Sequence, residues 1–313
     1  MSYQNDFLWQ GRVDAEDGPN GKRWHQVINA SKEYCDAALL GFACDIGVAN
    51  NKGRIGAAAG PDTIRQALTN MAWHHRAHIK DAGTVVADYD LVAAQQAFAE
   101  RVSKHLSCNE FVIGIGGGHE IGWASYLGVH QARPDKRIGI INIDAHFDLR
   151  QPSPNTSSGT PFWQVAQHCQ QQNQGFHYAC LGIAPTANTV ALYNRAAELD
   201  VVHVRDLDCN MTNVVPRLTD FLAQIDVLYL TICLDAFPAS MAPGVSAPSV
   251  IGVELKFVLQ LLVWLAKQQH YFGYDWAIAD IAEMNPTYDI DNRTAKLAAR
   301  LIDEIMTAKF NHF

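Results

Sequence analysis

Apolar runs and helix-like patterns alternate along the whole chain. Runs rich in β-branched residues predict strands at 37–42, 84–87, 111–115, 137–143, 177–183, 201–204, 227–234 and 276–281. Helical periodicity predicts helices at 61–72, 91–105, 120–131, 161–172, 186–198, 253–268 and 294–308. Strands that are apolar throughout, joined by helices, are typical of a parallel sheet covered on both faces. With no repeat, linker or composition break in the sequence, we expect one α/β domain over residues 1–313.

Composition excludes several classes of partner. The net charge of −8 gives no basic footprint for nucleic acid. The longest apolar run, residues 257–266, is too short to span a bilayer and is typical of a buried helix. The first residues lack the basic and apolar regions of a secretory signal, and the 7 cysteines are scattered without a C-x-x-C pair. We therefore expect a cytoplasmic protein with reduced thiols that binds neither nucleic acid nor membrane.

A glycine-rich turn follows the strand predicted at 111–115, in "FVIGIGGGHE". It is not a dinucleotide fingerprint, because after Gly114 and Gly116 the third required glycine would fall on His119. The chain also lacks a G-K-[ST] phosphate loop. One interpretation is a flexible turn alone; the other is that the turn presents His119 at the carboxyl edge of the sheet, where open α/β sheets form their sites.

The stretch "IGIINIDAHFDLR" carries three titratable residues at a strand end. Asp144, His146 and Asp148 alternate with apolar residues, so an extended chain would place them on one side. Crowded ionisable groups at a buried strand end need a cation among them or a fully satisfied hydrogen-bond cluster. Carboxylate and imidazole ligands suit Mn²⁺, Mg²⁺, Fe²⁺ or Zn²⁺.

A second polar pair ends the apolar stretch "LTICLDAF". Cys233 and Asp235 should point to the same side of the strand, and a buried Asp235 needs a compensating partner. Together with His119 and the D-x-H-x-D group, Asp235 brings the number of nitrogen and oxygen ligands above what one ion with bound water requires. The sequence therefore predicts a site for two metal ions.

Four motifs, "GGGHE", "DAHFD", "SGTPF" and "ADIAEMNP", resemble in order and spacing the arginase–agmatinase–formimidoylglutamase superfamily of manganese hydrolases. The resemblance covers nearly the whole chain, including "GRIGAAAGPDTIR" at residues 53–65. It implies a three-layer α/β/α fold with a mostly parallel sheet of about eight strands. It also implies two Mn²⁺ ions per subunit and attack on the substrate by a hydroxide that bridges them.

The resemblance also implies a set of metal ligands. One ion would be held by His119, Asp144, Asp148 and Cys233, and the other by Asp144, His146, Asp235 and Cys233. Asp148 would in addition accept the proton of the attacking hydroxide. Glu283, in "AEMNP", would face the cationic substrate nitrogen, although a structural glutamate is the alternative.

Within the superfamily, "LWQGRVD", "GGGHE" and "SGTPF" resemble the formimidoylglutamase branch. That branch implies hydrolysis of N-formimidoyl-L-glutamate to L-glutamate and formamide in histidine degradation. Phe162 stands where arginases have a catalytic histidine, which makes arginase activity less expected. The rival interpretations are another ureohydrolase, such as an agmatinase or guanidino-acid hydrolase, and a metal-poor, non-catalytic protein of the same fold.

Arg150 lies two residues beyond Asp148, where arginases have an asparagine, and an arginine there suits a substrate carboxylate. Asn155, Ser157 and Ser158 on the same loop are candidates for hydrogen bonds to the substrate. Ordinary solvated loop residues are the alternative for all four. Lys52 and Arg54 form a second candidate for anion binding, and the sequence is also compatible with a homo-oligomer.

Cys233 departs from the family, which typically has an aspartate bridging both metals at this position. A thiolate ligand is one interpretation, although sulfur is soft and Mn²⁺ is hard. A neutral thiol beside a weakened second metal site is another. The third is an oxidation switch in which Cys233 pairs with Cys35 or Cys44.

Overall fold

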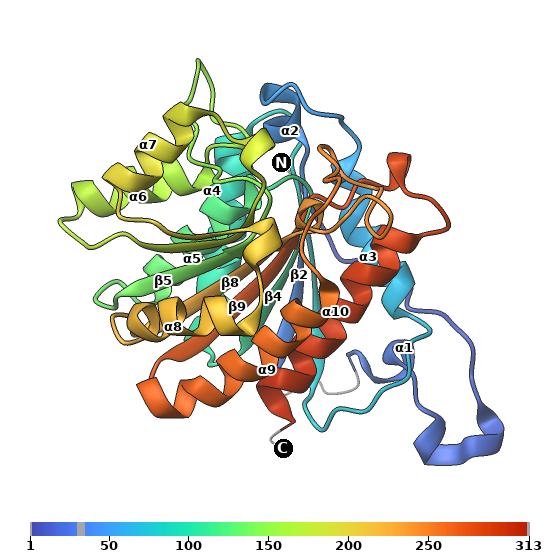
Figure 1. The fold of residues 1–313 in the computed structure, drawn as a ribbon. Helices are drawn as coiled ribbons and strands as arrows, with labels where there is room; N and C mark the ends of the chain where they lie inside the picture. Colours follow the sequence, from blue (N-terminus) through green and yellow to red (C-terminus); the bar gives the residue numbers. More distant parts are fainter. Residues whose placement is uncertain (1, 30–34, 312–313) are drawn as a thin grey trace.

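The computed structural model describes residues 2–29 and 35–311, which fold around one sheet. The sheet has nine strands in the order β1-β3-β2-β4-β9-β8-β5-β6-β7 (Figure 1). All neighbouring strands are parallel except β1, which is antiparallel to β3 at one edge. The strands span β1 Ser2–Gln4, β2 Ala37–Ala43, β3 Ile79–Val86, β4 Phe111–Gly116, β5 Ile138–Ile143, β6 His177–Ile183, β7 Val202–Arg205, β8 Val227–Cys233 and β9 Asp275–Ala282.

Helices cover both faces of the sheet (Figure 1). Side chains of α3, α8, α9 and α10 pack into the core on one face, and side chains of α4, α5, α6 and α7 pack into the core on the other. The helices span α1 Trp24–Val27, α2 Ile46–Asn50, α3 Gly60–Leu68, α4 Leu91–Ser107, α5 Ile121–Ala132, α6 Pro161–Gln171, α7 Val190–Glu198, α8 Met211–Leu222, α9 Leu255–Phe272 and α10 Arg293–Phe310. The predicted three-layer α/β/α class is confirmed, with nine strands in place of about eight.

Burial accounts for the apolar strands. β4, β5 and β8 are buried at every position because helices cover both their faces. Local signals define several helix ends: Asp90 caps the first turn of α4 through Ala93 N, and Gly273 ends α9 with a left-handed φ of 76°. Within the described part of the chain, none of the helices combines the length and apolarity needed to cross a membrane.

Four central strands bring the predicted motifs together. β4, β9, β8 and β5 are consecutive neighbours in the sheet, and they run parallel, so their carboxyl ends meet at one edge. Each of the motifs at His119, Glu283, Cys233 and Asp144 follows or ends one of these strands. The sheet topology therefore gathers residues from four distant parts of the sequence.

Candidate metal centre

The glycine turn after β4 fits tightly against the end of β2. A Cβ on Gly117 would lie 1.7 Å from the Cys44 carbonyl oxygen, so only glycine fits there. The Gly117 amide donates to the Phe42 carbonyl at 2.7 Å, and the Gly118 amide donates to the Cys44 carbonyl at 2.9 Å. The turn thereby directs the fully buried His119 toward the ends of the central strands.

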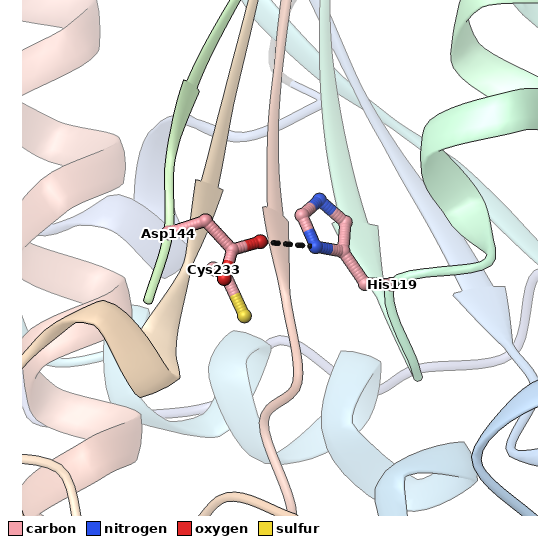
Figure 2. A group of neighbouring side chains, drawn as sticks. All are labelled: His119, Asp144 and Cys233. Carbon is pink, nitrogen blue, oxygen red and sulfur yellow. Dashed lines mark ion pairs between the residues drawn. The ribbon is translucent and has the colours of Figure 1, made fainter. Parts of the chain in front are cut away.

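A first group of potential ligands contains His119, Asp144 and Cys233, whose ligand atoms all lie within 4.8 Å of one another. Figure 2 shows the Asp144 carboxylate and the His119 ring facing each other, with the Cys233 sulfur beside the carboxylate. The His119 Nδ1 atom lies 2.9 Å from Asp144 Oδ2 and 3.0 Å from Asp148 Oδ2. These four residues are those that the resemblance implies for one metal ion.

A second group contains Asp144, His146 and Asp235, again with ligand atoms within 4.8 Å of one another. The His146 Nδ1 atom lies 3.2 Å from Asp235 Oδ2 and 3.4 Å from Asp144 Oδ1. Asp144 belongs to both groups and presents one oxygen to each histidine. This arrangement matches the bridging position expected for Asp144.

The D-x-H-x-D stretch is not the extended strand end that its alternation predicts. β5 ends at Ile143, and the chain then bends at Ala145 and His146. Asp148 adopts a left-handed φ of 49°, a conformation that few residues other than glycine adopt and that commonly marks functional sites. The acidic and imidazole groups converge because the loop turns. The prediction that an extended strand places these side chains on one side was therefore wrong for this segment.

Neighbouring side chains fix the orientation of the ligand groups. Asn142 Nδ2 donates to Asp144 Oδ2 at 3.1 Å, and the His146 amide donates to Asp144 Oδ1 at 2.8 Å. The other ring nitrogen of His119, Nε2, lies 3.0 Å from Thr231 Oγ1. Such partners select the ring tautomer and hold ligand geometry in metal sites.

A buried aspartate lies behind Thr231. Asp280, on β9, accepts hydrogen bonds of 2.6 Å from both Ser125 Oγ and Tyr229 Oη. Sequence reasoning missed this network and Asn142. The available signal was a single polar residue inside an otherwise apolar strand, as at Asn142, Thr231 and Asp280.

The carboxylates of the cluster carry more negative charge than its two histidines can neutralise. Burial, followed by the charge of Asp144, raises the pKa of Asp148 to about 6, and the same causes raise the pKa of Asp235. Burial and the nearby carboxylates likewise raise the pKa of the Cys233 thiol well above its usual range. For Asp144, burial is outweighed by hydrogen bonds from His119 and His146, which lower its pKa. The site therefore favours a bound cation.

Unpaired polar atoms support the same conclusion. Asp235 Oδ1 and Glu283 Oε2 are buried without a hydrogen-bond partner. Leaving buried polar atoms unpaired is costly, and ligation of a divalent ion would satisfy such atoms. The donor set of imidazole, carboxylate and thiol fits a transition-metal ion.

Glu283 lies at the mouth of the cluster. It is buried, adopts a left-handed φ of 71°, and its Oε1 accepts the His119 amide at 3.0 Å. Burial, then the charges of Asp235 and Glu120, raise the pKa of Glu283 to about 8. Its backbone amide donates to the Gly117 carbonyl at 2.8 Å, so the glycine turn and the AEMNP turn hold each other in place.

A cleft of about 540 Å³ opens over the cluster. Its lining includes His119, His146, Asp148, Cys233, Asp235 and Glu283, together with Asn50, Asn51, Lys52, Arg54, Arg150 and Ser158. Arg150 is exposed and projects from the loop after Asp148. Arg54 donates to the Ser246 and Val245 carbonyls and lies 4.0 Å from the Tyr288 ring centroid, so its guanidinium holds the loop at 245–246.

The predicted loop residues are divided between two places. Ser158 lines the main cleft, and its Oγ accepts a hydrogen bond of 3.3 Å from Asn51 Nδ2. Asn155 and Ser157 line a neighbouring cavity instead, and the buried Ser157 Oγ accepts from the Gly159 amide within its own turn. Phe162 is fully buried beneath the site, with its ring centroid 5.4 Å from that of His119.

The sheet topology contradicts an intramolecular disulfide from Cys233 to either predicted partner. Cys35 precedes β2 and so lies at the amino edge of the sheet, opposite Cys233 at the carboxyl edge. Cys44 follows β2, which is three strand spacings from β8, or about 14 Å. A disulfide needs Cα atoms within about 7 Å, so neither pair can form without moving the backbone.

Comparison with known proteins agrees with the predicted resemblance. A sequence profile of the arginase family matches residues 35–308. The formimidoylglutamase of Hahella chejuensis is 47% identical over 303 residues, covering 94% of this chain and 92% of its own length. The formimidoylglutamase of Vibrio vulnificus strain YJ016 is 48% identical over 325 residues, covering 97% and 95%.

Solved structures share the fold. Trypanosoma cruzi formiminoglutamase with Mn²⁺ superposes with a TM-score of 0.82 at 22% identity, covering 92% of this chain and 98% of that one. Bacillus subtilis arginase superposes with a TM-score of 0.71 at 23% identity, covering 86% and 98%. The matched profile and the identity over nearly the full length establish that the chain belongs to the arginase family.

Proposed function

We propose that the protein hydrolyses N-formimidoyl-L-glutamate to L-glutamate and formamide, using two Mn²⁺ ions bound at the carboxyl edge of the sheet. The observation that carries this proposal is the pair of ligand groups sharing Asp144 at the base of the cleft. Formimidoylglutamases that are 47–48% identical over nearly the full length support the choice of substrate.

The residues present suit two metal ions. His119, Asp144, Asp148 and Cys233 would hold one ion, and Asp144, His146 and Asp235 would hold the other. When bound, such a pair polarises water and stabilises the negative charge that develops during hydrolysis. Mn²⁺ suits this site because three of the six ligand residues are carboxylates and two are imidazoles.

The chain's own groups would orient the substrate and move the proton. Glu283 offers the unpaired Oε2 atom at the mouth of the cluster, where it would pair with the cationic amidine nitrogen. Asp148 contacts both the metal cluster and the cleft, so its carboxylate would accept the proton of the attacking water and pass it to the leaving nitrogen. Arg150, exposed at the cleft, would bind a substrate carboxylate through its planar fork.

Cys233 would act as a thiolate ligand to the ion held by His119 and Asp144. Burial and neighbouring carboxylates keep its thiol protonated in the absence of a cation. A divalent ion reverses that preference, because coordination deprotonates a thiol directly. A sulfur donor in place of an oxygen donor would also broaden the range of metals that the site accepts.

The direct test is a substrate screen on protein reconstituted with Mn²⁺, with product identification. We expect formamide and L-glutamate from N-formimidoyl-L-glutamate, and no urea from arginine or agmatine. Urea from agmatine would favour an agmatinase, and failure to bind metal at saturating Mn²⁺ would contradict both hydrolase assignments.

Asp148→Asn gives the matched variant for the same assay. Because the amide oxygen can still bind metal but cannot take up the proton, turnover should fall by at least about 100-fold while metal content is retained. Turnover near that of the unmodified protein would refute the assigned role of Asp148.

The wider setting completes the proposal. We place the enzyme in the cytoplasm and in histidine degradation, the role that the formimidoylglutamase resemblance implies. We further propose that residues 1–313 form one catalytic domain and that the subunits assemble as a homo-oligomer. Size-exclusion chromatography with light scattering would measure the assembly.

A further inference from the structure

A side pocket of about 290 Å³ lies next to the main cleft. Asn50, Asn51 and Arg150 line both spaces, so they form the wall between them. The side pocket also contains Arg195 on α7 and the predicted loop residues Asn155 and Ser157. None of the described residues that line it is an aspartate or a glutamate, so its two arginines, Arg150 and Arg195, have no acidic side chain beside them in the lining.

Arg195 is fixed beside the metal-binding loop. Its Nη1 atom donates a hydrogen bond to the carbonyl of Leu149, the residue between Asp148 and Arg150. The side chain is half-buried and joins α7 to the loop that carries one predicted metal ligand and the predicted carboxylate-binding arginine. This contact holds the Arg195 guanidinium against Leu149, the residue that follows Asp148 in the sequence.

That hydrogen bond uses only part of the group's capacity. A guanidinium has five N–H donors, and one carbonyl accepts from one of them. In the described part of the chain, neither Arg150 nor Arg195 forms an ion pair with a carboxylate. Two cationic side chains on the wall of one small cavity favour an anionic ligand group in that cavity.

We infer that the side pocket binds the side-chain carboxylate of the glutamate portion, held between Arg195 and Arg150. This inference rests on the proposed function, which requires a substrate with two carboxylates. The α-carboxylate is attached to the carbon that carries the reacting nitrogen, and so it stays in the main cleft. The second carboxylate lies two methylene groups farther away, and Arg150 at the shared wall leads from one space to the other.

The consequence is a preference for glutamate over glutamine. Both have the same length and shape, but only glutamate can form charge-assisted, bidentate hydrogen bonds with a guanidinium. The energy of a hydrogen bond to a charged group corresponds to binding of glutamate about 10–100-fold tighter than binding of glutamine. Arg195 is thus a residue that determines substrate specificity, separate from the residues assigned to the metal ions and the proton.

The test compares L-glutamate with L-glutamine as ligands of the Mn²⁺-loaded protein, by calorimetry and by competitive inhibition. Arg195→Gln retains an N–H donor for the Leu149 carbonyl but removes the charge, and Arg195→Lys retains the charge without the fork. We expect Arg195→Gln to lower the preference for glutamate at least about tenfold and Arg195→Lys to restore part of it. Arg205→Ala, an exposed arginine outside both cavities, makes the same change in net charge and should leave the preference unaltered.

Two outcomes would overturn the inference. One is equal binding of glutamate and glutamine by the unmodified protein. The other is an Arg195→Gln variant that loses metal content or turnover while its glutamate preference is unchanged, since Arg195 would then only hold the Leu149 carbonyl. Failure of the unmodified, metal-loaded protein to hydrolyse N-formimidoyl-L-glutamate would instead refute the proposed function, and that assay is scored separately.

Discussion

At the scale of single residues, Cys233 stands where the family resemblance implies an aspartate. It ends β8 and joins His119 and Asp144 in one ligand group. A soft sulfur among hard oxygen donors changes which metals the site prefers, and it also gives a spectroscopic probe of ligation, because thiolate ligands produce charge-transfer absorption with Co²⁺.

We therefore predict that Co²⁺ added to the metal-free protein gives a near-ultraviolet thiolate-to-cobalt band. The band should disappear in Cys233→Ser, while Cys108→Ser, at an exposed cysteine, should retain it. Cys233→Asp should lose the band as well and bind Mn²⁺ more tightly than the unmodified protein, because the new ligand is a hard oxygen donor. A band of equal intensity in Cys233→Ser would show that the sulfur does not bind metal.

Arg150 carries the second prediction at this scale. Arg150→Ala removes a guanidinium from the wall of the cleft and should raise KM for N-formimidoyl-L-glutamate about tenfold or more. The kcat value should change much less, since the lost contact binds substrate and transition state alike. Steady-state kinetics measures both, with Arg205→Ala as the control for net charge. An unchanged kcat/KM would remove Arg150 from the substrate site.

The sequence predicted the site residues that belong to recognisable motifs of acidic, histidine and cysteine residues. His119, Asp144, His146, Asp148, Cys233 and Asp235 do lie together, because each follows or ends a central strand. Residues whose role depends on packing were missed. Asn142, Thr231 and Asp280 are single polar residues in apolar strands, and Arg195 comes from a helix whose position beside Leu149 depends on tertiary contacts.

At the scale of elements, the helices and strands that could be predicted from the sequence are mainly those with buried, apolar faces. Strands such as β6 were predicted at His177–Ile183 because continuous apolar runs reflect helices on both faces. β1 was missed because all three of its residues are exposed. α8 was missed because Pro216 lies within it, yet Val214, Leu218, Phe221 and Leu222 bury enough apolar surface to keep the segment helical.

A buried ion pair joins α3 to β3. Arg65 on α3 is 1% exposed and donates to both carboxylate oxygens of Asp81, at 2.9 and 3.0 Å. Trp9 Nε1 donates to the same carboxylate at 2.9 Å, which attaches the amino-terminal segment to this pair. Arg65→Met should lower the free energy of unfolding by about 3–5 kcal/mol, because it leaves a buried carboxylate unpaired.

Urea unfolding of the metal-loaded protein measures this cost. Asp62→Ala is the matched control, since Asp62 also contacts Arg65 at 3.1 Å but its side chain is 69% exposed. That variant should change the free energy of unfolding by less than about 1 kcal/mol. Equal losses in the two variants would contradict the importance assigned to burial.

A surface pair at the amino edge of the sheet predicts a dependence of stability on pH. Arg137 donates hydrogen bonds to Asp226 through its side chain and its backbone amide, and these lower the pKa of Asp226 to about 2. Because the folded pKa is depressed, the stabilisation is fully present above the unfolded value near 4 and is lost as the pH falls toward 2.

Asp226→Asn tests that dependence. It should lower the free energy of unfolding by about 0.5–1 kcal/mol at pH 7, a modest loss because solvent screens a partly exposed pair. The difference between the variant and the unmodified protein should shrink as the pH is lowered from 4 to 3. A difference that grows over this range in urea melts would give the opposite sign and refute the assignment.

At the scale of the whole molecule, the candidate metal centre connects the middle of the sheet. Its residues come from the ends of β4, β5 and β8, with Glu283 after β9, so they join four neighbouring strands. Without a cation, Asp144, Asp148 and Asp235 repel one another in a buried space, as the raised pKa values of Asp148 and Asp235 indicate. Metal binding should therefore stabilise the fold as well as enable the reaction.

We accordingly predict that chelation lowers the melting temperature. A ligand at 100 times its dissociation constant stabilises the folded state by about 2.7 kcal/mol, which corresponds to roughly 5 °C for a chain of this size. Differential scanning calorimetry with chelator, and then with Mn²⁺ restored, measures the change.

Asp144→Ala removes the residue shared by both ligand groups, so the melting temperature of this variant should not respond to chelator or to Mn²⁺. Asp235→Ala alters only one group and should retain part of the response. A melting temperature of the unmodified protein that is independent of Mn²⁺ at every concentration would contradict a metal-stabilised sheet edge, whatever the enzyme's activity.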